Sequence, residues 1–550
     1  MSERIKILQI PGMSRREFLR LTGGTVATLA SSALLVELLE ACGGSSTTGA
    51  STHTLTIGIA GDPDTLDPEF GQSSRTNELI KNRYAQWSRY ATVDAGGGNM
   101  KADLSNVVGE ALESFSVDAD GVTVHMKVRQ AKFASGNSMS SDDFVYKVQR
   151  ALGIPNAGTA FDFNIIGISG AGQVTKGGTM DLTFKLAHPS PILGPMLRDQ
   201  DAGIIDSALL KQHVASDDQW GQKWLAKNSA GGGAYVVSSW TAGSKMVLKA
   251  NPNYWGPAPY FDTVVLQEVP SPDDRVLLLQ NGTIDIAADL SSDAATRLKG
   301  QTGVNVISAP TIAQDMFGFV CNRAPFNNVQ VRRAIAYAIP YDQLVTNILR
   351  GEAKVAKGVF PQNSIWFTNE DYPYTTDPTK AKAMLAAAGH SNLTFAVEIR
   401  DTDADAQALA VPIQSALQQI GVTMNISKLA SAEFQQHLGQ GAAQAWIQSG
   451  LGAYVDDPFY QCFLWYATKA VINWFKYSSP VVDAVNDKLQ SELDVNTRKS
   501  LGSQLQKQLN QDLPYISLGE PNFLLPVRAN IGGFLYEPDG LLTYRYFKRS

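Results

Sequence analysis

A strand–helix–strand pattern in the second half of the chain restricts the fold more than any other feature. Residues 393–399 alternate apolar and polar side chains as a strand does, residues 403–420 show a helical pattern, and residues 422–429 return to strand-like alternation. Gly421 stands where the helix must end, because glycine adopts a left-handed backbone conformation without steric cost. Two strands joined by a helix predict a mixed α/β domain.

Other segments add strands and capped helices to this pattern. Residues 54–59 alternate as a half-buried strand, and residues 115–128 alternate on both sides of a polar turn, which predicts a hairpin. Residues 140–143 place an acid three positions after a serine, and residues 271–274 place proline and two acids after a serine. Both patterns predict helix starts, as does the Asp-Pro pair that opens residues 377–389.

The first residues predict export. Arg15 and Arg16 form a paired-arginine signal, and the apolar run at 21–39 is too short and too rich in small residues for a membrane span. The run ends at Cys42 in a sequence that looks like the cleavage and lipidation box of a lipoprotein. We therefore expect residues 1–41 to be a twin-arginine lipoprotein signal peptide, Cys42 to carry the lipid, and residues 42–53 to be a flexible leash.

Composition is typical of a globular protein with several domains. The chain has 550 residues, of which 44% are hydrophobic, and a net charge of −6 without any basic block, so nucleic acid is not expected as a partner. No stretch after the leash is apolar for long enough to cross a membrane. The expected contact with the membrane is therefore through the lipid anchor only.

Cysteines and histidines indicate no cofactor. The six histidines are scattered without a pair at helical ligand spacing, so no metal site is expected. Cys321 and Cys462 could form a disulfide in an oxidising compartment or stay as two free thiols. The sequence leaves both possibilities open.

An ordered series of motifs resembles the extracellular solute-binding proteins of family 5, which are the dipeptide- and oligopeptide-binding receptors of ABC importers. Each motif is weak alone, but together they span residues 54–550 in family order. The matching segments are 63–68, 110–115, 132–144, 233–240, 251–286, 319–322, 325–328, 331–335 and 457–458.

The resemblance implies an α/β fold with two lobes that close like a clamshell, the class II arrangement of periplasmic binding proteins. Lobe I would comprise residues 54–313, with an inserted subdomain at about 96–228, and lobe II residues 314–514. Residues 515–550 would return to lobe I. The apolar segments 317–322 and 515–518 are the expected hinge strands, and the ligand would be enclosed between the lobes of a monomer.

Residues 446–466 are the most site-like stretch, because they combine many aromatic side chains with two acids, as an enclosed small-molecule pocket requires. This stretch and the matching motifs supply the expected ligand-binding residues, which are Trp446, Tyr454, Asp456, Asp457, Asn322 and Asp64.

The same stretch departs from the pattern of peptide-binding members. These place Gly-Trp before the loop, where the Trp lines the cleft, and an Asp three residues before the Asp-Pro acid, where it holds the ligand's amino terminus. Here the corresponding residues are Leu451, after Gly450, and Tyr454. A phenol cannot pair with an ammonium group, so either Asp456 or Asp457 takes that role or the solute is neutral or sugar-like.

The leading functional hypothesis is an extracytoplasmic lipoprotein that captures peptides or peptide-like solutes and delivers them to the permease and ATPase subunits of an ABC importer. The alternatives are a binding protein for a non-peptide solute, a sensor or chaperone-like receptor with the same fold, and a secreted enzyme. We assign no catalytic residue, because the sequence has no G-x-S-x-G, H-E-x-x-H or phosphate-loop motif.

Overall fold

The strand–helix–strand unit is present as predicted. The computed structural model describes residues 53–71, 73–155, 157–199 and 202–550. In it β15 (Thr394–Arg400) and β16 (Thr423–Leu429) are parallel neighbours, joined by α14 (Ala404–Gln419). The Asp403 carboxylate caps α14 by accepting from the Ala406 amide at 3.0 Å. Gly421 follows with a φ of +85°, which is the left-handed conformation expected of it.

The N-terminal predictions concern residues outside the described ranges. Arg15, Arg16, Cys42 and the leash up to residue 52 all belong to this part. Export through the paired arginines and lipidation of Cys42 therefore stay predictions.

The other local predictions are confirmed. The first strand is β1 (Thr54–Ile59), and β4 (Leu112–Val117) pairs antiparallel with β5 (Thr123–Val128) as the predicted hairpin. The three predicted helices are α4 (Ser141–Gly153), α9 (Pro272–Gln280) and α13 (Pro378–Ala387).

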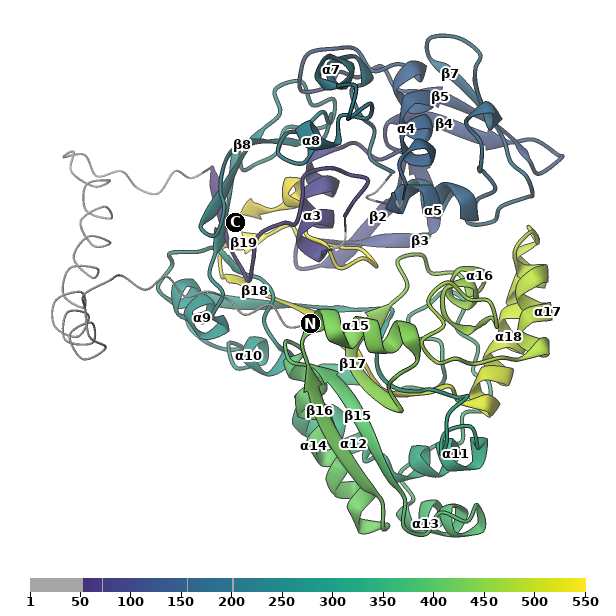
Figure 1. Ribbon diagram of the computed structural model, residues 1–550. Helices are drawn as coiled ribbons and strands as arrows, with labels where there is room; N and C mark the ends of the chain where they lie inside the picture. Colours follow the sequence, from purple (N-terminus) through teal and green to yellow (C-terminus); the bar gives the residue numbers. More distant parts are fainter. Residues whose placement is uncertain (1–52, 72, 156, 200–201) are drawn as a thin grey trace, which may run out of the picture. The chain divides into compact units, whose positions relative to one another are not determined.

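One sheet runs through both halves of the described chain (Figure 1), and twelve described strands belong to it. In spatial order its main path is β16, β15, β17 (Ala445–Gly452), β13 (Ala313–Phe319), β18 (Tyr515–Arg528), β11 (Ile286–Ala287), β1, β10 (Thr263–Glu268), β9 (Lys245–Ala250) and β8 (Tyr235–Thr241). Two further strands, β12 (Val304–Pro310) and β14 (Ala353–Lys354), pair with β18.

The long strand β18 connects the two halves of this sheet. Its beginning pairs with β13, where Met316 lies opposite Ser517, and its end pairs with β12, where Ser308 lies opposite Leu524. The chain thus crosses between the halves twice, at residues 310–313 and at residues 519–522. The expected hinge strands begin within β13 and β18, on the second-half side of these crossings.

A separate α/β segment is inserted into the first half. A four-stranded sheet has the order β4, β5, β7 (Asp181–Lys185), β6 (Val174–Lys176), and α4 and α5 (Gly158–Ile165) belong to the same segment. The buried Trp87 contacts Phe144 edge-on, with ring centroids 4.7 Å apart. Before the insertion, β2 (Ser88–Gly96) and β3 (Asn99–Gly109) form a hairpin joined by β20 (Leu535–Tyr536).

Shorter elements complete the fold. The remaining α-helices among the described residues are α3 (Ser74–Arg83), α6 (Leu193–Leu197), α7 (Ser207–Leu210), α8 (Gln222–Leu225), α10 (Ser292–Thr296), α11 (Val329–Ala338), α12 (Tyr341–Gln343), α15 (Ser431–Gln440), α16 (Pro458–Gln461), α17 (Pro480–Leu489) and α18 (Val495–Asp512). The remaining strands are β19 (Ile531–Gly532) and β21 (Lys548–Arg549).

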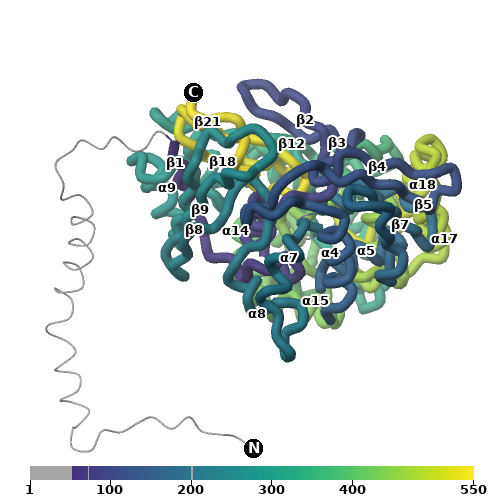
Figure 2. The backbone as a smooth tube through the Cα atoms, turned by 90° about the horizontal axis from the view of Figure 1, so that it is seen from above, coloured from purple at the N-terminus to yellow at the C-terminus, as the bar shows by residue number. Residues whose placement is uncertain are grey.

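Each half has its own apolar core. The buried side chains of β1, β10 and the end of β18 form one cluster, and those of β13, β15, α11, α14 and the beginning of β18 form another. The C-terminal residues return to the first half, since the Arg549 guanidinium donates to the Thr54 carbonyl at 3.2 Å. Figure 2 shows β21 beside β1 and β18 accordingly.

Two further findings bear on the sequence analysis. Among the described helices, none has both the length and the apolar character needed to span a membrane. Cys321 and Cys462 are both free thiols, so the disulfide considered from the sequence is not formed.

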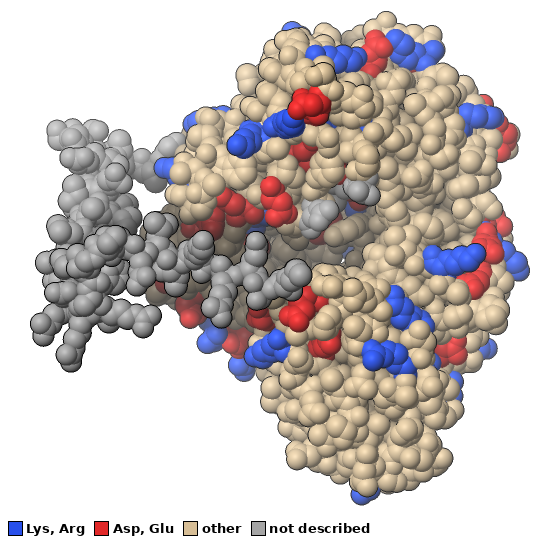
Figure 3. All heavy atoms as spheres, in the orientation of Figure 1, with Lys and Arg blue, Asp and Glu red and all other residues tan. Residues whose placement is uncertain are grey.

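On the face shown in Figure 3, Lys and Arg are interspersed with Asp and Glu.

Candidate ligand-binding site

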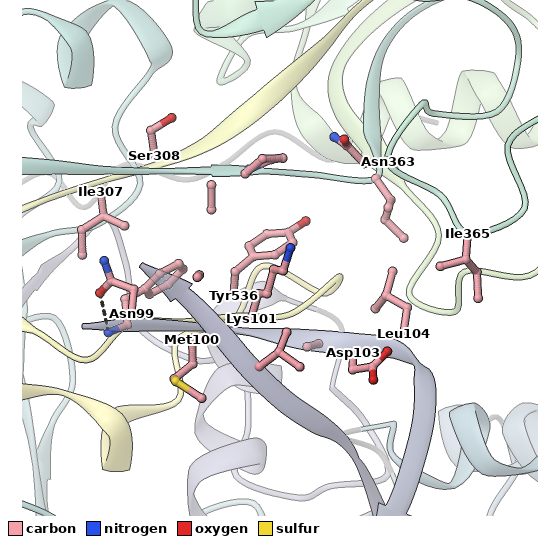
Figure 4. Close-up of a pocket in the computed structure, with 17 residues that line it drawn as sticks. Asn99, Met100, Lys101, Asp103, Leu104, Ile307, Ser308, Asn363, Ile365 and Tyr536 are labelled. Atoms are coloured by element: carbon pink, nitrogen blue, oxygen red, sulfur yellow. Dashed lines mark hydrogen bonds between the residues drawn. The ribbon is translucent and has the colours of Figure 1, made fainter. Parts of the chain in front are cut away.

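A cavity of about 680 Å³ lies where β3, β12, β20 and the segment at 363–365 meet. Pockets for small organic ligands usually have volumes of about 300–1,000 Å³, so this one can hold a small solute. Figure 4 shows Lys101 and Tyr536 in the space between β3 and β12, with Ile365 and Asn363 across from them.

The cavity is mostly apolar, with one cationic side chain, Lys101, and one acidic side chain, Asp103, among its lining residues. Leu104, Ile307 and Ile365 supply aliphatic wall, while the exposed Lys101 has no ion pair with another described residue. Asn363 is already engaged, since its amide nitrogen donates to the Thr311 carbonyl at 2.8 Å. Such walls suit apolar side chains of a solute, and Lys101 suits an anionic group such as a carboxylate.

Asp456 holds one wall of this cavity in place. Its carboxylate accepts from the Ser364 hydroxyl at 2.6 Å and from the Ile365 amide at 2.9 Å, and its carbonyl accepts from the Trp366 indole at 2.8 Å. Burial raises the pKa of Asp456 to about 6, against the lowering effect of the hydrogen bonds from Ser364 and Ile365. Asp456, one of the predicted ligand-binding residues, therefore holds the cavity wall in position without lining the cavity itself.

Asp457 is engaged in a helix cap and an ion pair. Its carboxylate accepts from the Phe459 amide at 2.8 Å at the start of α16, and it pairs with the Arg498 guanidinium at 2.6 Å. Both side chains are buried. Removing either partner would leave an uncompensated buried charge, so the pair has a clear structural role.

Tyr454 and Trp446 lie in different environments. The Tyr454 side chain is 45% exposed, and its carbonyl accepts from the Arg198 guanidinium at 2.7 Å. Trp446 on β17 is fully buried and stacks on Phe475, with ring centroids 5.5 Å apart. Its contacts are those of a core residue.

Asn322 and Asp64 are both exposed, and the Asp64 amide donates to the Thr76 hydroxyl at 2.9 Å. None of the six predicted residues lines the 680 Å³ cavity, so the structure does not gather them into it. Their contact with a ligand stays a prediction. Lys101, Asn363 and Tyr536 belong to no motif and stand far apart in the sequence, so only the fold brings them together.

A second cavity of about 240 Å³ lies beside the second crossing, where Pro521 and Asn522 line it. It is lined by Arg75, Glu78 and Asp289 from the first half and by Asp315, Asp405 and Gly450 from the second. The Asp315 carboxyl is 1% exposed and accepts from the Gly450 amide at 2.8 Å. Asp315 was not identified from the sequence, where its only signal is an acid next to the apolar segment 316–321.

Two lobes, two chain crossings and a solute-sized cavity where they meet define a binding protein of the two-lobed periplasmic type. The family model of the bacterial extracellular solute-binding proteins, family 5, matches residues 106–471. The chain therefore belongs to that family, as the motif series indicated.

Known proteins agree with this assignment. The chain is 28% identical to the probable D,D-dipeptide-binding periplasmic protein DdpA of Escherichia coli over 491 residues, which is 88% of this chain and 92% of that protein. It is 23% identical to the dipeptide-binding protein of the same organism, over 88% of this chain and 93% of that one.

Solved structures show the same fold. The periplasmic binding protein DppA from Helicobacter pylori, in complex with the peptide STSA, superposes with a TM-score of 0.77 at 20% identity, over 90% of this chain and 98% of that one. NikZ from Campylobacter jejuni, in complex with Ni(L-His), gives a TM-score of 0.76 at 18% identity, over 90% of this chain and all of that one. The fold prediction of two α/β lobes is confirmed.

Proposed function

We propose that this protein captures peptides or peptide-like solutes outside the cytoplasm and delivers them to the permease and ATPase subunits of an ABC importer. The observation that carries the proposal is the family match over residues 106–471. The dipeptide-binding function printed for two relatives supports the peptide class of solute. The secreted-enzyme alternative loses support, because these relatives are described as binding proteins.

We place the solute in the 680 Å³ cavity. Its aliphatic walls accept side chains of varied shape, and Lys101 attracts the terminal carboxylate of a peptide. Asp456 contributes indirectly, because it fixes Ser364 and Ile365 at the wall.

A non-peptide solute is the second candidate. It is favoured by Tyr454, which stands where peptide-binding members carry the amine-holding Asp. The same fold in NikZ binds a nickel–histidine complex, so the architecture itself does not dictate a peptide.

Attachment to the membrane is proposed to occur through lipid on Cys42 after export directed by Arg15 and Arg16. The mature protein is expected to act as a monomer on the outer face of the cytoplasmic membrane or in the periplasm. Extraction from membranes by detergent but not by salt supports the anchor, and unchanged membrane association of Cys42→Ala contradicts it.

Calorimetric titration with a library of peptides of two to five residues tests the function. We expect saturable binding of at least one peptide at one site per chain. Lys101→Met should weaken binding by about 1.5–3 kcal/mol if the lysine meets a carboxylate, the range for a hydrogen bond to a charged group.

Lys127→Met is the matched control, because Lys127 is also exposed and forms no ion pair with a described residue. Its binding should equal that of the unmodified protein. Equal binding by all three proteins would remove Lys101 from the site, and a library without any binder would contradict the peptide assignment.

A further inference from the structure

The buried carboxyl of Asp315 has an unusual backbone setting. Asp315 lies on β13, where the pairing register with β17 shifts between Gln314 and Met316 and the register with β18 shifts between Asp315 and Met316. The regular ladder is thus interrupted on both sides of this residue. At the interruption the Gly450 amide donates to one Asp315 carboxylate oxygen at 2.8 Å.

The second carboxylate oxygen of Asp315, Oδ2, has no hydrogen-bond partner among the described residues, although it is buried. Buried polar groups in native proteins are nearly always paired, so an orphan carboxylate oxygen calls for an explanation. Asp315 lines the 240 Å³ cavity, which offers the space for a partner from outside the chain.

The charges around Asp315 favour a cation as that partner. Burial above all, together with the neighbouring Asp405 and Asp403, raises the pKa of Asp315 to about 8, against the lowering effect of the Gly450 amide. Arg75, the cation in the cavity wall, is already paired with Glu78 and Asp289. Asp315 is therefore an acid in this cavity without a positive partner among the residues that the structure describes.

The other acids nearby are engaged. Asp405 accepts from the Ser292 amide and hydroxyl, at 3.1 and 3.0 Å. Asp403 caps α14 and accepts from the Ser449 hydroxyl at 2.6 Å. Asp315 is thus the acid in this cavity with a free buried oxygen.

We propose that Asp315 binds a protonated amine or guanidinium group of a ligand that enters the 240 Å³ cavity. The inference rests on the proposed function as a solute-binding protein. It gives the cationic-group role to Asp315, whereas Asp456 and Asp457 are engaged within the chain. The cavity is smaller than the usual pocket of about 300–1,000 Å³ for a small organic ligand, so it suits a terminal or side-chain head group of a larger solute.

The two cavities flank one strand pair. Residues 307–310 of β12 line the larger cavity, and their partners 522–525 on β18 line the smaller one. Lys101 thus attracts anionic groups in the larger cavity, against β12, and Asp315 attracts cationic groups in the smaller cavity, against β18.

The direct test uses n-butylamine and n-butanol as probes, which have similar shapes but differ in charge. Binding is measured by saturation-transfer NMR on the full protein. We expect n-butylammonium to bind at least tenfold more tightly than n-butanol, and Asp315→Asn to remove that preference. The surface variant Asp217→Asn, whose carboxylate pairs with Lys223 on the exterior, should retain it.

The pH profile provides a readout that a purely structural role would not change. Binding of the amine requires the Asp315 carboxylate, so affinity should rise about tenfold per pH unit from pH 6 toward 8 and then level off. Asp315→Asn should show a flat profile. The other charged groups that line this cavity are Arg75, Glu78, Asp289 and Asp405, and Asp403 also raises the pKa of Asp315. All of them are unchanged in Asp315→Asn, so any pH dependence that remains in the variant comes from them.

The wild-type comparison of the two probes and its pH profile remain decisive even if Asp315→Asn fails to fold. Equal binding of amine and alcohol, or a flat wild-type profile, overturns the proposal. Failure of the peptide library is a separate result, since it contradicts the peptide assignment while the butylamine measurement still decides the role of Asp315. If peptides bind, the affinity of each peptide is compared with that of its N-acetylated form. A loss of affinity on acetylation identifies the terminal amine as the cation, and no loss identifies a side chain.

Discussion

At the scale of single residues, buried ion pairs are the clearest stabilising contacts in this protein. Arg150 forms two hydrogen bonds to the Asp67 carboxylate, at 2.9 and 2.6 Å, and Lys147 pairs with Glu69 at 2.9 Å. All four side chains are at most 2% exposed. Burial alone would raise the pKa of Glu69, but Lys147 and Arg150 hold it below its ordinary value.

Arg150→Met should therefore lower the free energy of unfolding by about 3–5 kcal/mol, because it leaves the buried Asp67 charge uncompensated. Urea denaturation followed by circular dichroism measures this. Lys223→Met is the control, since it removes an exposed ion pair with Asp217 and should leave the midpoint unchanged. A loss below about 1 kcal/mol for Arg150→Met would show that Asp67 finds another partner or becomes protonated.

Residue roles were predictable from the sequence only where the partners are local. An aspartate in a proline-rich loop tends to cap a turn with its own side chain, and the Asp67 carboxylate accepts from the Glu69 amide at 3.0 Å. Its ion-pair partner Arg150 lies far away in the sequence, and no sequence pattern indicated that the two residues pair. For the same reason Asp457 was identified as a site-like acid, while its partner Arg498 could not be.

At the scale of elements, the helix starts were predictable because capping involves residues within one turn. The Ser271 hydroxyl accepts from the Asp274 amide at 3.2 Å, as the spacing indicated. Ser271→Ala should lower the free energy of unfolding by about 1 kcal/mol. Ser271→Asp, which keeps an acceptor at the cap, should lose much less, and equal losses for both variants would contradict the capping role.

Strand β18 shows where element prediction fails. The sequence indicated a strand at 515–518, but the strand extends to Arg528 and includes Pro521 and Pro526. Proline weakens the local strand signal because it donates no hydrogen bond. Pairing with β12 and β14 overrides that preference, and this pairing depends on contacts far apart in the chain.

At the scale of the whole molecule, the motif series predicted the two-lobed fold, and the family match confirms it. The cavities could not be predicted, since their walls combine β3, β12, β20 and distant loops that no periodicity relates. The departure at Tyr454 was visible in the sequence. The acid that we propose in its place, Asp315, became apparent only from its burial and its unpaired oxygen.

Native mass spectrometry of the protein purified in its folded state tests the central claim, capture of a peptide or peptide-like solute, most directly. The ligand released on gentle unfolding is fragmented and identified. We expect a species one ligand heavier than the chain, whose ligand fragments as a peptide and can be exchanged for peptides of the library. A bound solute without peptide bonds that no peptide displaces would contradict the account.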